Sequence, residues 1–246
     1  MWNADKIVYR NDDSFVRAYQ GSELVWEKPS SNNKIFYTST DGQIVTPDIG
    51  IGEESKGFGA NIVSNTYSGG RGVIVFDGPV TKIGYTAFGR CNTLQTIVIP
   101  DSVTSIGRSA FSYCTSLTTI TIPDSVTSIG QIAFFSCERL TSITIPKSVK
   151  HIDIGVFGKC TSLISITIPF SVRGIKWDAF KDCSQLSEVI VNAVTPPELY
   201  PEQYIGIYNQ FENNAPGRKI KVPAESLQAY KTAPGWSDYA DDIIAQ

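Results

Sequence analysis

The sequence predicts a solenoid, mainly β, in which short coils stack so that their first strands form a parallel sheet. The main observation is a strict interval of 23 residues between successive cysteines, which are Cys91, Cys114, Cys137, Cys160 and Cys183. Phenylalanines three positions before the cysteines and leucines three positions after them keep the same interval. Self-similarity at a period of about 20 to 50 residues is the signature of a protein built from stacked units.

The repeat unit reads L-x-x-I-x-I-P-x-S-V-x-x-I-G-x-x-A-F-x-x-C-x-x, and each part of it predicts a piece of one coil. In residues 117–122, LTTITI, isoleucines and threonines alternate as they do in a half-buried strand. Pro123 ends this strand because proline lacks the backbone donor. Gly130 is predicted to lie in a turn, and Phe134 to fill the inside of the coil. Five full copies span 71–185, and a sixth strand follows at 186–191.

The cysteine column is predicted to be structural, a ladder of buried, reduced thiols. Zinc sites use closely spaced pairs such as C-x-x-C, and the sequence contains no such pair. Thiols stacked in one column point in parallel, whereas a disulfide needs Cβ atoms roughly 3.5–4.5 Å apart on side chains turned toward each other. Neither a metal nor another cofactor is predicted.

The repeat also resembles that of a known family. The sequence IPDSVTSIG occurs at 99–107 and again at 122–130, each time followed by Ala-Phe and then by Cys-x-x-Leu. It closely resembles the BspA-like leucine-rich repeat of bacterial surface proteins, and the resemblance covers about half of the chain. It implies a leucine-rich-repeat solenoid with a role in surface binding or adhesion, without naming a ligand. The later coils depart from the pattern, since Asp153 and Lys176 stand in the glycine column.

Four regions are expected along the chain. Residues 1–28 are predicted to form a small β meander, with strands at 6–10, 15–19 and 23–27. Residues 29–70 are predicted to be a linker and N-terminal cap with strand-like pieces at 35–37 and 61–63, and 71–191 to be the repeats. Residues 192–246 are expected to form a C-terminal cap with a strand at 219–222 and a short helix at 224–232. Within it, Trp236 and Tyr239 are expected to cover the open end of the core.

Composition and motifs argue against several classes of function. The net charge of −3 provides no basic face for nucleic acid. No apolar stretch approaches the ~18–20 residues that span a bilayer, and the first residues do not have the pattern of a signal peptide. His151 is the one histidine, and its column accepts small or polar residues, so it is expected to lie on the surface. The sequence has no phosphate-binding loop, and we expect no enzyme.

Two surfaces are candidates for binding. The first is the solvent side of the concave sheet, an uncharged and hydroxyl-rich strip made of Thr96, Val98, Thr119, Thr121, Ser142, Thr144, Ser165, Thr167, Glu188 and Ile190. Such a strip suits a broad contact with protein or glycan, although threonines also serve simply to keep an exposed strand soluble. The second is a patch of Phe170 and Trp177, near which the cap supplies Tyr200, Tyr204, Tyr208 and Phe211. This patch is either a partner site or a surface that the cap covers.

The resemblance and the lack of an active site favour a non-enzymatic binding or adhesion module displayed on a bacterial surface. Its partners would be proteins or glycans on host or neighbouring cells, and its location the cell surface or the extracellular space. The alternative is a structural accessory protein of a phage or prophage particle. Residues 1–28 resemble small modules at the head of some phage-encoded proteins, and in that case they would dock the chain to a partner.

Overall fold

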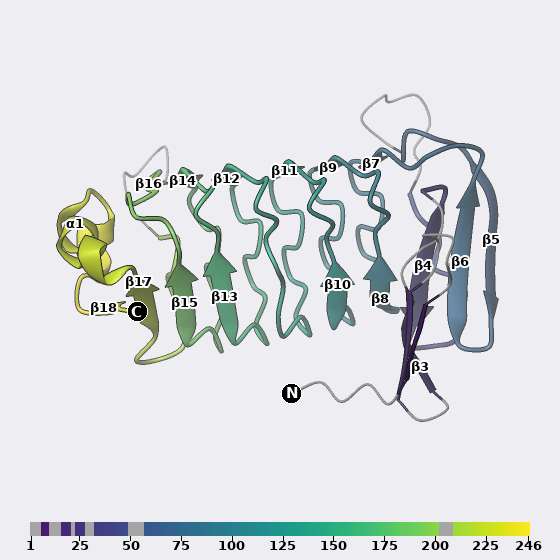
Figure 1. Cartoon of the computed structure of the whole chain (residues 1–246), viewed down its shortest axis with the longest axis horizontal. Coiled ribbons are helices and arrows are strands. Elements are labelled where there is room, and N and C mark those ends of the chain that lie inside the picture. Colours follow the sequence, from purple (N-terminus) through teal and green to yellow (C-terminus); the bar gives the residue numbers. More distant parts are fainter. Residues whose placement is uncertain (1–5, 10–15, 21–22, 28–31, 49–56, 202–208) are drawn as a thin grey trace.

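The computed structural model describes residues 32–48, 57–201 and 209–246, together with the backbone of three strands near the N-terminus (Figure 1). Coils stack side by side along the long axis of the molecule, and their first strands follow one another along it in two hydrogen-bonded parallel groups. The first group is β8 (Leu94–Val98) with β10 (Thr119–Thr121), and the second is β13 (Ser165–Ile168), β15 (Glu188–Val191), β17 (Lys219–Val222) and β18 (Ile243–Ala245). The coil between β10 and β13 joins the second group through the parallel bridge of Thr144 to Thr167, and we call this whole row of strands the long sheet. The parallel pairing within each group confirms the predicted stacking of coils.

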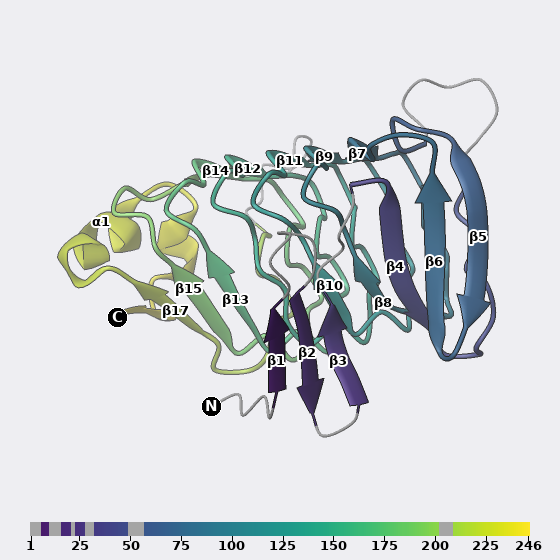
Figure 2. The same cartoon turned by 45° about the vertical axis from the view of Figure 1, so that its right-hand side comes forward.

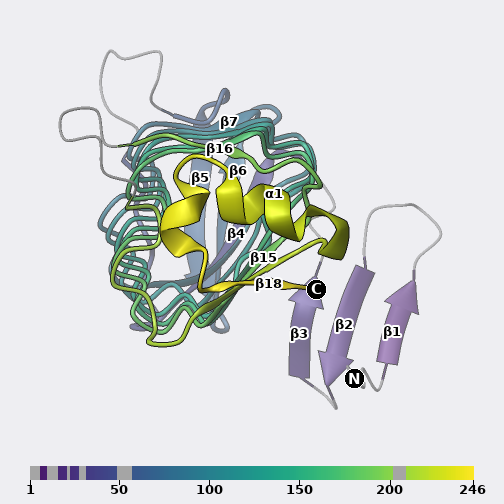
Figure 3. The same cartoon turned by 90° about the vertical axis from the view of Figure 1, so that its left-hand side faces the viewer.

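A second row of short parallel strands runs along another edge of the coils. They are β7 (Lys82–Ile83), β9 (Ser105–Ile106), β11 (Ser128–Ile129), β12 (His151–Ile152), β14 (Gly174–Ile175) and β16 (Glu198–Leu199). Figure 3 looks along the stack and shows successive coils superposed. The buried hydrophobic residues of the coils form one continuous core cluster. From β8 to β16, each coil therefore contributes one segment of the long sheet and one short strand of this edge.

The N-terminal part of the solenoid corrects one expectation. The copy that begins at residue 71 does not start with a parallel strand, because β6 (Arg71–Phe76) pairs antiparallel with β4 (Lys34–Ser39) and β5 (Ile62–Ser68). Strand β4 also pairs antiparallel with β8 and so lies between β8 and β6. The parallel stack therefore starts at β8, and β4 to β6 cover its first strand.

The N-terminal meander contains the three predicted strands. They are β1 (Lys6–Tyr9), β2 (Val16–Gln20) and β3 (Glu23–Glu27), and they form an antiparallel sheet in the order β1-β2-β3 (Figure 2).

A stack of phenylalanine rings runs through the core. Phe88, Phe111, Phe134, Phe157 and Phe180 are fully or almost fully buried, and neighbouring ring centroids are 5.3–5.7 Å apart with nearly parallel planes. The stack continues to Phe211, 5.4 Å from Phe180 with an interplanar angle of 2°. The sequence grouped Phe211 with the aromatics of the cap near Phe170 and Trp177, whereas in the structure its ring fills the last coil.

The cysteines form the predicted ladder of free thiols. Cys114, Cys137, Cys160 and Cys183 are buried, and Cys91 at the start of the ladder is half-buried. Each buried thiol donates to the backbone carbonyl of the phenylalanine of the preceding coil, as Cys114 does to Phe88 at 3.0 Å and Cys137 to Phe111 at 3.3 Å. The cysteines thus connect adjacent coils through hydrogen bonds.

The glycine column begins a turn, as expected, and it also has a second role. The carbonyl of Gly130 accepts a hydrogen bond from the amide of Ala133 at 3.2 Å, so Gly130 is the first residue of the turn. A Cβ at Gly130 would be 2.6 Å from the backbone nitrogen of Arg108 and 2.9 Å from the carbonyl carbon of Gly107. The left-handed backbone of the turns is instead adopted by other residues, for example Ser109 with φ 58° and Tyr113 with φ 59°. Glycine is needed at 130 because two coils approach closely, and no side chain fits between them.

The C-terminal cap agrees with the prediction and extends it. Strand β17 matches 219–222, and η1 (Ala224–Ser226) with α1 (Leu227–Thr232) matches the predicted helix. The η2 segment (Trp236–Tyr239) places the buried ring of Trp236 6.1 Å from Phe211, while Tyr239 meets Phe211 edge-on at 5.4 Å. Trp236 and Tyr239 therefore cover the end of the core, as expected.

Candidate functional site

The strand registers arrange most of the predicted binding residues in two rows, within each of the two groups of strands that make up the long sheet. We call the ten residues the sheet strip: Thr96, Val98, Thr119, Thr121, Ser142, Thr144, Ser165, Thr167, Glu188 and Ile190. In the first row Thr96 pairs with Thr119, and Ser165 with Glu188. In the second row Val98 pairs with Thr121, Thr144 with Thr167, and Thr167 with Ile190.

The middle of the sheet strip is its most exposed part. Thr119, Thr121, Ser142, Thr144 and Thr167 are exposed, while the isoleucines that alternate with them are buried. Because stacked strands lie ~4.8 Å apart, the hydroxyl groups form regular rows on a backbone that the core holds in place. This surface can donate and accept hydrogen bonds, and its middle carries no charge.

The two ends of the sheet strip are engaged with neighbouring side chains. At the N-terminal end, the hydroxyl oxygens of Thr38 and Thr96 are 2.8 Å apart. At the C-terminal end, Lys221 of β17 forms an ion pair with Glu188. Lys221 lies beside Ile190 in the sheet, so β17 extends the surface beyond the predicted residues. The sequence pattern missed this extension because the interval between β15 and β17 is longer than the repeat period.

The second candidate, Phe170 with Trp177, is not a single patch around one groove. Phe170 is 68% exposed and lines a shallow groove of about 490 Å³ with Arg173, Val194, Pro196 and five other residues. Trp177 is half-buried, lies on the other side of β14 in the sequence, and does not line this groove. Of the cap aromatics, Tyr200 is half-buried and Phe211 is in the core. Tyr204 and Tyr208 lie outside the described residues.

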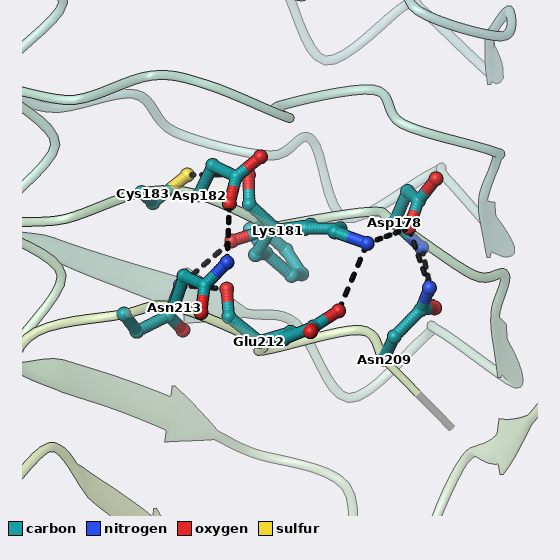
Figure 4. Close-up of polar contacts among 9 residues, drawn as sticks. Asp178, Lys181, Asp182, Cys183, Asn209, Glu212 and Asn213 are labelled. Carbon is teal, nitrogen blue, oxygen red and sulfur yellow. Dashed lines mark hydrogen bonds and ion pairs between the residues drawn. The ribbon is translucent and has the colours of Figure 1, made fainter. Parts of the chain in front are cut away.

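A polar network joins the fifth copy of the repeat to the last coil (Figure 4). Lys181 lies between Asp178 and Glu212, with Nζ–oxygen distances of 3.7 Å and 2.9 Å. The hydrogen bond with Glu212 is the main reason why the pKa of Lys181 is raised. Side-chain amides complete the network, Asn209 donating to Asp178 and Asn213 to Asp182, both at 2.7 Å. These charged groups satisfy one another, and we assign them to holding the coils together.

The single histidine and the acidic side chains are the first candidates for a catalytic or metal-binding arrangement. His151 is exposed, as expected for a surface substitution. In the described ranges, no three His, Cys, Asp or Glu side chains are grouped so that they could hold a metal ion. The same ranges contain no helix of the length and apolar character that crossing a membrane requires.

Comparison with known proteins gives one family match and several similar structures. The model of the BspA type leucine rich repeat region matches residues 81–196, in 6 copies. A leucine rich repeat protein of T. pallidum is 31% identical over 59% of this chain and 67% of its own, with a TM-score of 0.46. The pneumococcal vaccine antigen PcpA is 18% identical over 68% of this chain, with a TM-score of 0.50. A leucine rich cell surface protein of Faecalibacterium prausnitzii is 22% identical over 65% of this chain, with a TM-score of 0.34.

This chain spans 39% of the pneumococcal antigen and 59% of the Faecalibacterium protein. No curated protein matches it. The family match covers the coils whose cysteine and phenylalanine columns are described above. The predicted repeat type is therefore confirmed, and residues 81–196 of this chain are BspA-type leucine-rich repeats.

Proposed function

We propose that this chain is a non-enzymatic binding module, displayed on a bacterial surface, that contacts proteins or glycans through the sheet strip. The observation that carries the proposal is the exposed, uncharged middle of the strip, where five hydroxyl side chains face solvent on one side of a rigid sheet. The BspA-type repeats support it, because their resemblance is to those of bacterial surface proteins.

The rigidity of the strip is what suits it to binding. Ile120, Ile143 and Ile166 alternate with the hydroxyl residues and are at most 8% exposed, so the core fixes the backbone beneath the strip. A ligand would therefore meet hydroxyl groups that are already positioned, and little further ordering of the protein would oppose binding. Rows of hydroxyls without charged or aromatic anchors favour a broad contact made of many weak hydrogen bonds.

Charge substitutions in the middle of the strip test the proposal. The double variant Thr121→Lys, Thr144→Lys would be compared with the wild-type chain on a glycan array and on immobilised extracellular-matrix proteins. Lysine side chains would cover the hydroxyl rows, so we expect at least a tenfold loss of binding to any ligand found. The matched control is Thr104→Lys, Thr127→Lys, which adds the same charge at exposed positions on the return path of the coils. Equal binding by the strip variant and the wild-type chain would exclude the strip.

The location needs its own experiment. Immunogold labelling with antibody to the repeats would be applied to intact source cells and to an induced phage lysate. We expect gold on the cell envelope. Gold on particles would contradict the surface role, support a phage structural protein, and make the β1–β3 sheet the segment to study.

A further inference from the structure

A row of cationic and aromatic side chains crosses four successive turns on the outside of the coils. We call Arg90, Tyr113, Phe135 and Lys159 the turn row. The Arg90 guanidinium lies 5.9 Å from the centroid of the Tyr113 ring, and the Lys159 ammonium 5.6 Å from that of Phe135. Between them the two rings meet edge-on, with centroids 5.6 Å apart. The order along the solenoid is therefore cation, ring, ring, cation.

Three of the four residues of the turn row have a left-handed backbone. Arg90, Tyr113 and Lys159 occupy one column of the repeat and have φ angles of 63°, 59° and 58°. Left-handed backbone is unfavourable for large side chains, so each coil carries some strain here. Arg90 and Lys159 are exposed, and Tyr113 is 44% exposed.

The Phe135 ring packs against Gly155 and Gly158 of the next coil. A Cβ on Gly158 of the next coil would lie 3.0 Å from Cδ2 of Phe135, and a Cβ on Gly155 would lie 3.9 Å from the same atom. Glycine at both positions lets the ring lie close against the next coil and remain half-buried on the surface. One side of the Phe135 ring therefore contacts the next coil, and the rest of the ring faces solvent.

The charged groups of the turn row contact aromatic rings, whereas those of the next coil contact polar side chains of the cap. There the same two columns hold Lys181 and Asp182, which bind Glu212 and Asn213 in the network of Figure 4. In the described part of the chain, Arg90 and Lys159 form no ion pair and contact rings instead.

The turns around the row carry charges of both signs. The four turn segments, 84–92, 107–115, 130–138 and 153–161, contain the cations Arg90, Arg108 and Lys159 and the acids Glu138 and Asp153. Asp153 is paired with Lys176 at 2.9 Å, and the carboxylate of Asp48, which lies against the first of these turns, accepts a hydrogen bond from Thr86 at 3.2 Å.

We propose that the turn row binds a linear acidic polysaccharide that contains uronic acid units and lies along the solenoid axis. The two cations are three coils apart, about 14 Å at the usual strand spacing, and would each pair with a carboxylate. The apolar faces of the sugar rings between those carboxylates would pack on Tyr113 and Phe135. Anchors of a protein partner usually fill pockets, whereas this row is linear and follows the repeat, which suits a polymer with its own repeat.

The proposal deepens the binding role proposed above and rests on it, but it uses a different surface. The probe is polygalacturonate of defined length, titrated calorimetrically into the wild-type chain and into variants. We expect Tyr113→Ala, Phe135→Ala together to weaken binding at least tenfold, and Arg90→Gln, Lys159→Gln to do the same. The methyl-esterified polymer, which has lost its charge, should bind at least tenfold more weakly, and added salt should weaken the binding of the acidic form.

Matched controls separate this site from the sheet strip and from misfolding. Thr121→Ala, Thr144→Ala should leave polygalacturonate binding unchanged, and each variant should keep the circular dichroism spectrum of the wild type and unfold in a single transition in urea. The proposal is overturned if the polymer does not bind, if turn-row variants bind as the wild type does, or if polyglutamate binds equally well. None of these outcomes affects the strip, whose own lysine variants are measured on other ligands.

Discussion

The side-chain amide of Asn214 donates a hydrogen bond to the backbone carbonyl of Phe180 at 2.8 Å. The thiol of Cys183 makes the equivalent bond to Phe157 at 3.0 Å. The two positions correspond because Glu188 pairs with Lys219 in the sheet, and Asn214 precedes Lys219 by the same five residues by which Cys183 precedes Glu188. Asn214 thus takes the place of the next cysteine, although the interval from Cys183 to Asn214 is longer than the repeat period.

Asn214→Ala should destabilise the last coil, because the carbonyl of Phe180 loses its side-chain donor. We expect a loss of about 1–3 kcal/mol in the free energy of unfolding, measured by urea denaturation. Asn214→Cys restores a donor, although it gives up the acceptor that Arg218 contacts at 3.3 Å, and should therefore cost less. Ser184→Ala, at an exposed position, is the control. If the alanine and cysteine variants were equally stable, the proposed equivalence would be wrong.

Phe134 and Phe135 are neighbours in the sequence with opposite roles. Phe134 is 0% exposed and stacks between Phe111 and Phe157, so Phe134→Ala leaves a cavity and should cost about 3–5 kcal/mol. Phe135 is half-buried on the outside, and Phe135→Ala should cost well under half as much. Urea denaturation of both variants checks the difference, and similar losses would show that Phe135 is also part of the core.

Gly130→Ala should destabilise the chain although the backbone there is not left-handed. The new Cβ would be 2.6 Å from the nitrogen of Arg108, which belongs to the backbone of the adjacent coil and cannot move alone. We expect a loss of about 1–3 kcal/mol by thermal or urea unfolding. Gly78→Ala is the matched control, because its Cβ would meet only Ala60 at 3.8 Å. A Gly130 variant as stable as this control would mean that the coils can separate to admit a methyl group.

Stability should fall in alkaline solution because of the cysteine ladder. Burial raises the pKa of the Cys91 thiol to about 11, and it also raises the pKa values of Cys114, Cys137 and Cys160. In the unfolded chain these thiols ionise near pH 8.5, whereas in the folded chain they stay protonated. Their contribution is therefore complete below about pH 8.5 and is lost as the pH rises toward the folded pKa values.

Each such thiol lowers the free energy of unfolding by up to ~1.4 kcal/mol per pH unit in that range. Urea midpoints measured between about pH 7.5 and pH 10.5 should decrease, and Cys137→Ala should flatten the slope although it lowers stability at neutral pH. A midpoint that stayed constant over this range would contradict the burial of the ladder.

Much of the fold could be predicted from the columns of the repeat. The regular interval was enough to place the parallel strands, the phenylalanine stack and the thiols, because identical residues in successive coils must meet. The structure was predicted less well where the chain departs from the 23-residue interval of the repeat. Phe211 continues the stack after a longer interval, and β6 occupies a position in the repeat but pairs with β4 and β5. Whether the strip and the turn row bind ligands stays a prediction.

The sequence by itself determined which side chains face the core and which side of the sheet carries hydroxyl groups, because strand alternation and the repeat impose both. Only the tertiary structure decided how the two ends of the stack are covered and which charges are neutralised. Lys221 reaches Glu188, and Arg90 lies over Tyr113, through contacts between different coils. Such contacts depend on the spacing and twist of neighbouring coils and on irregular segments, and the outer columns carry no repeated residue that would indicate them.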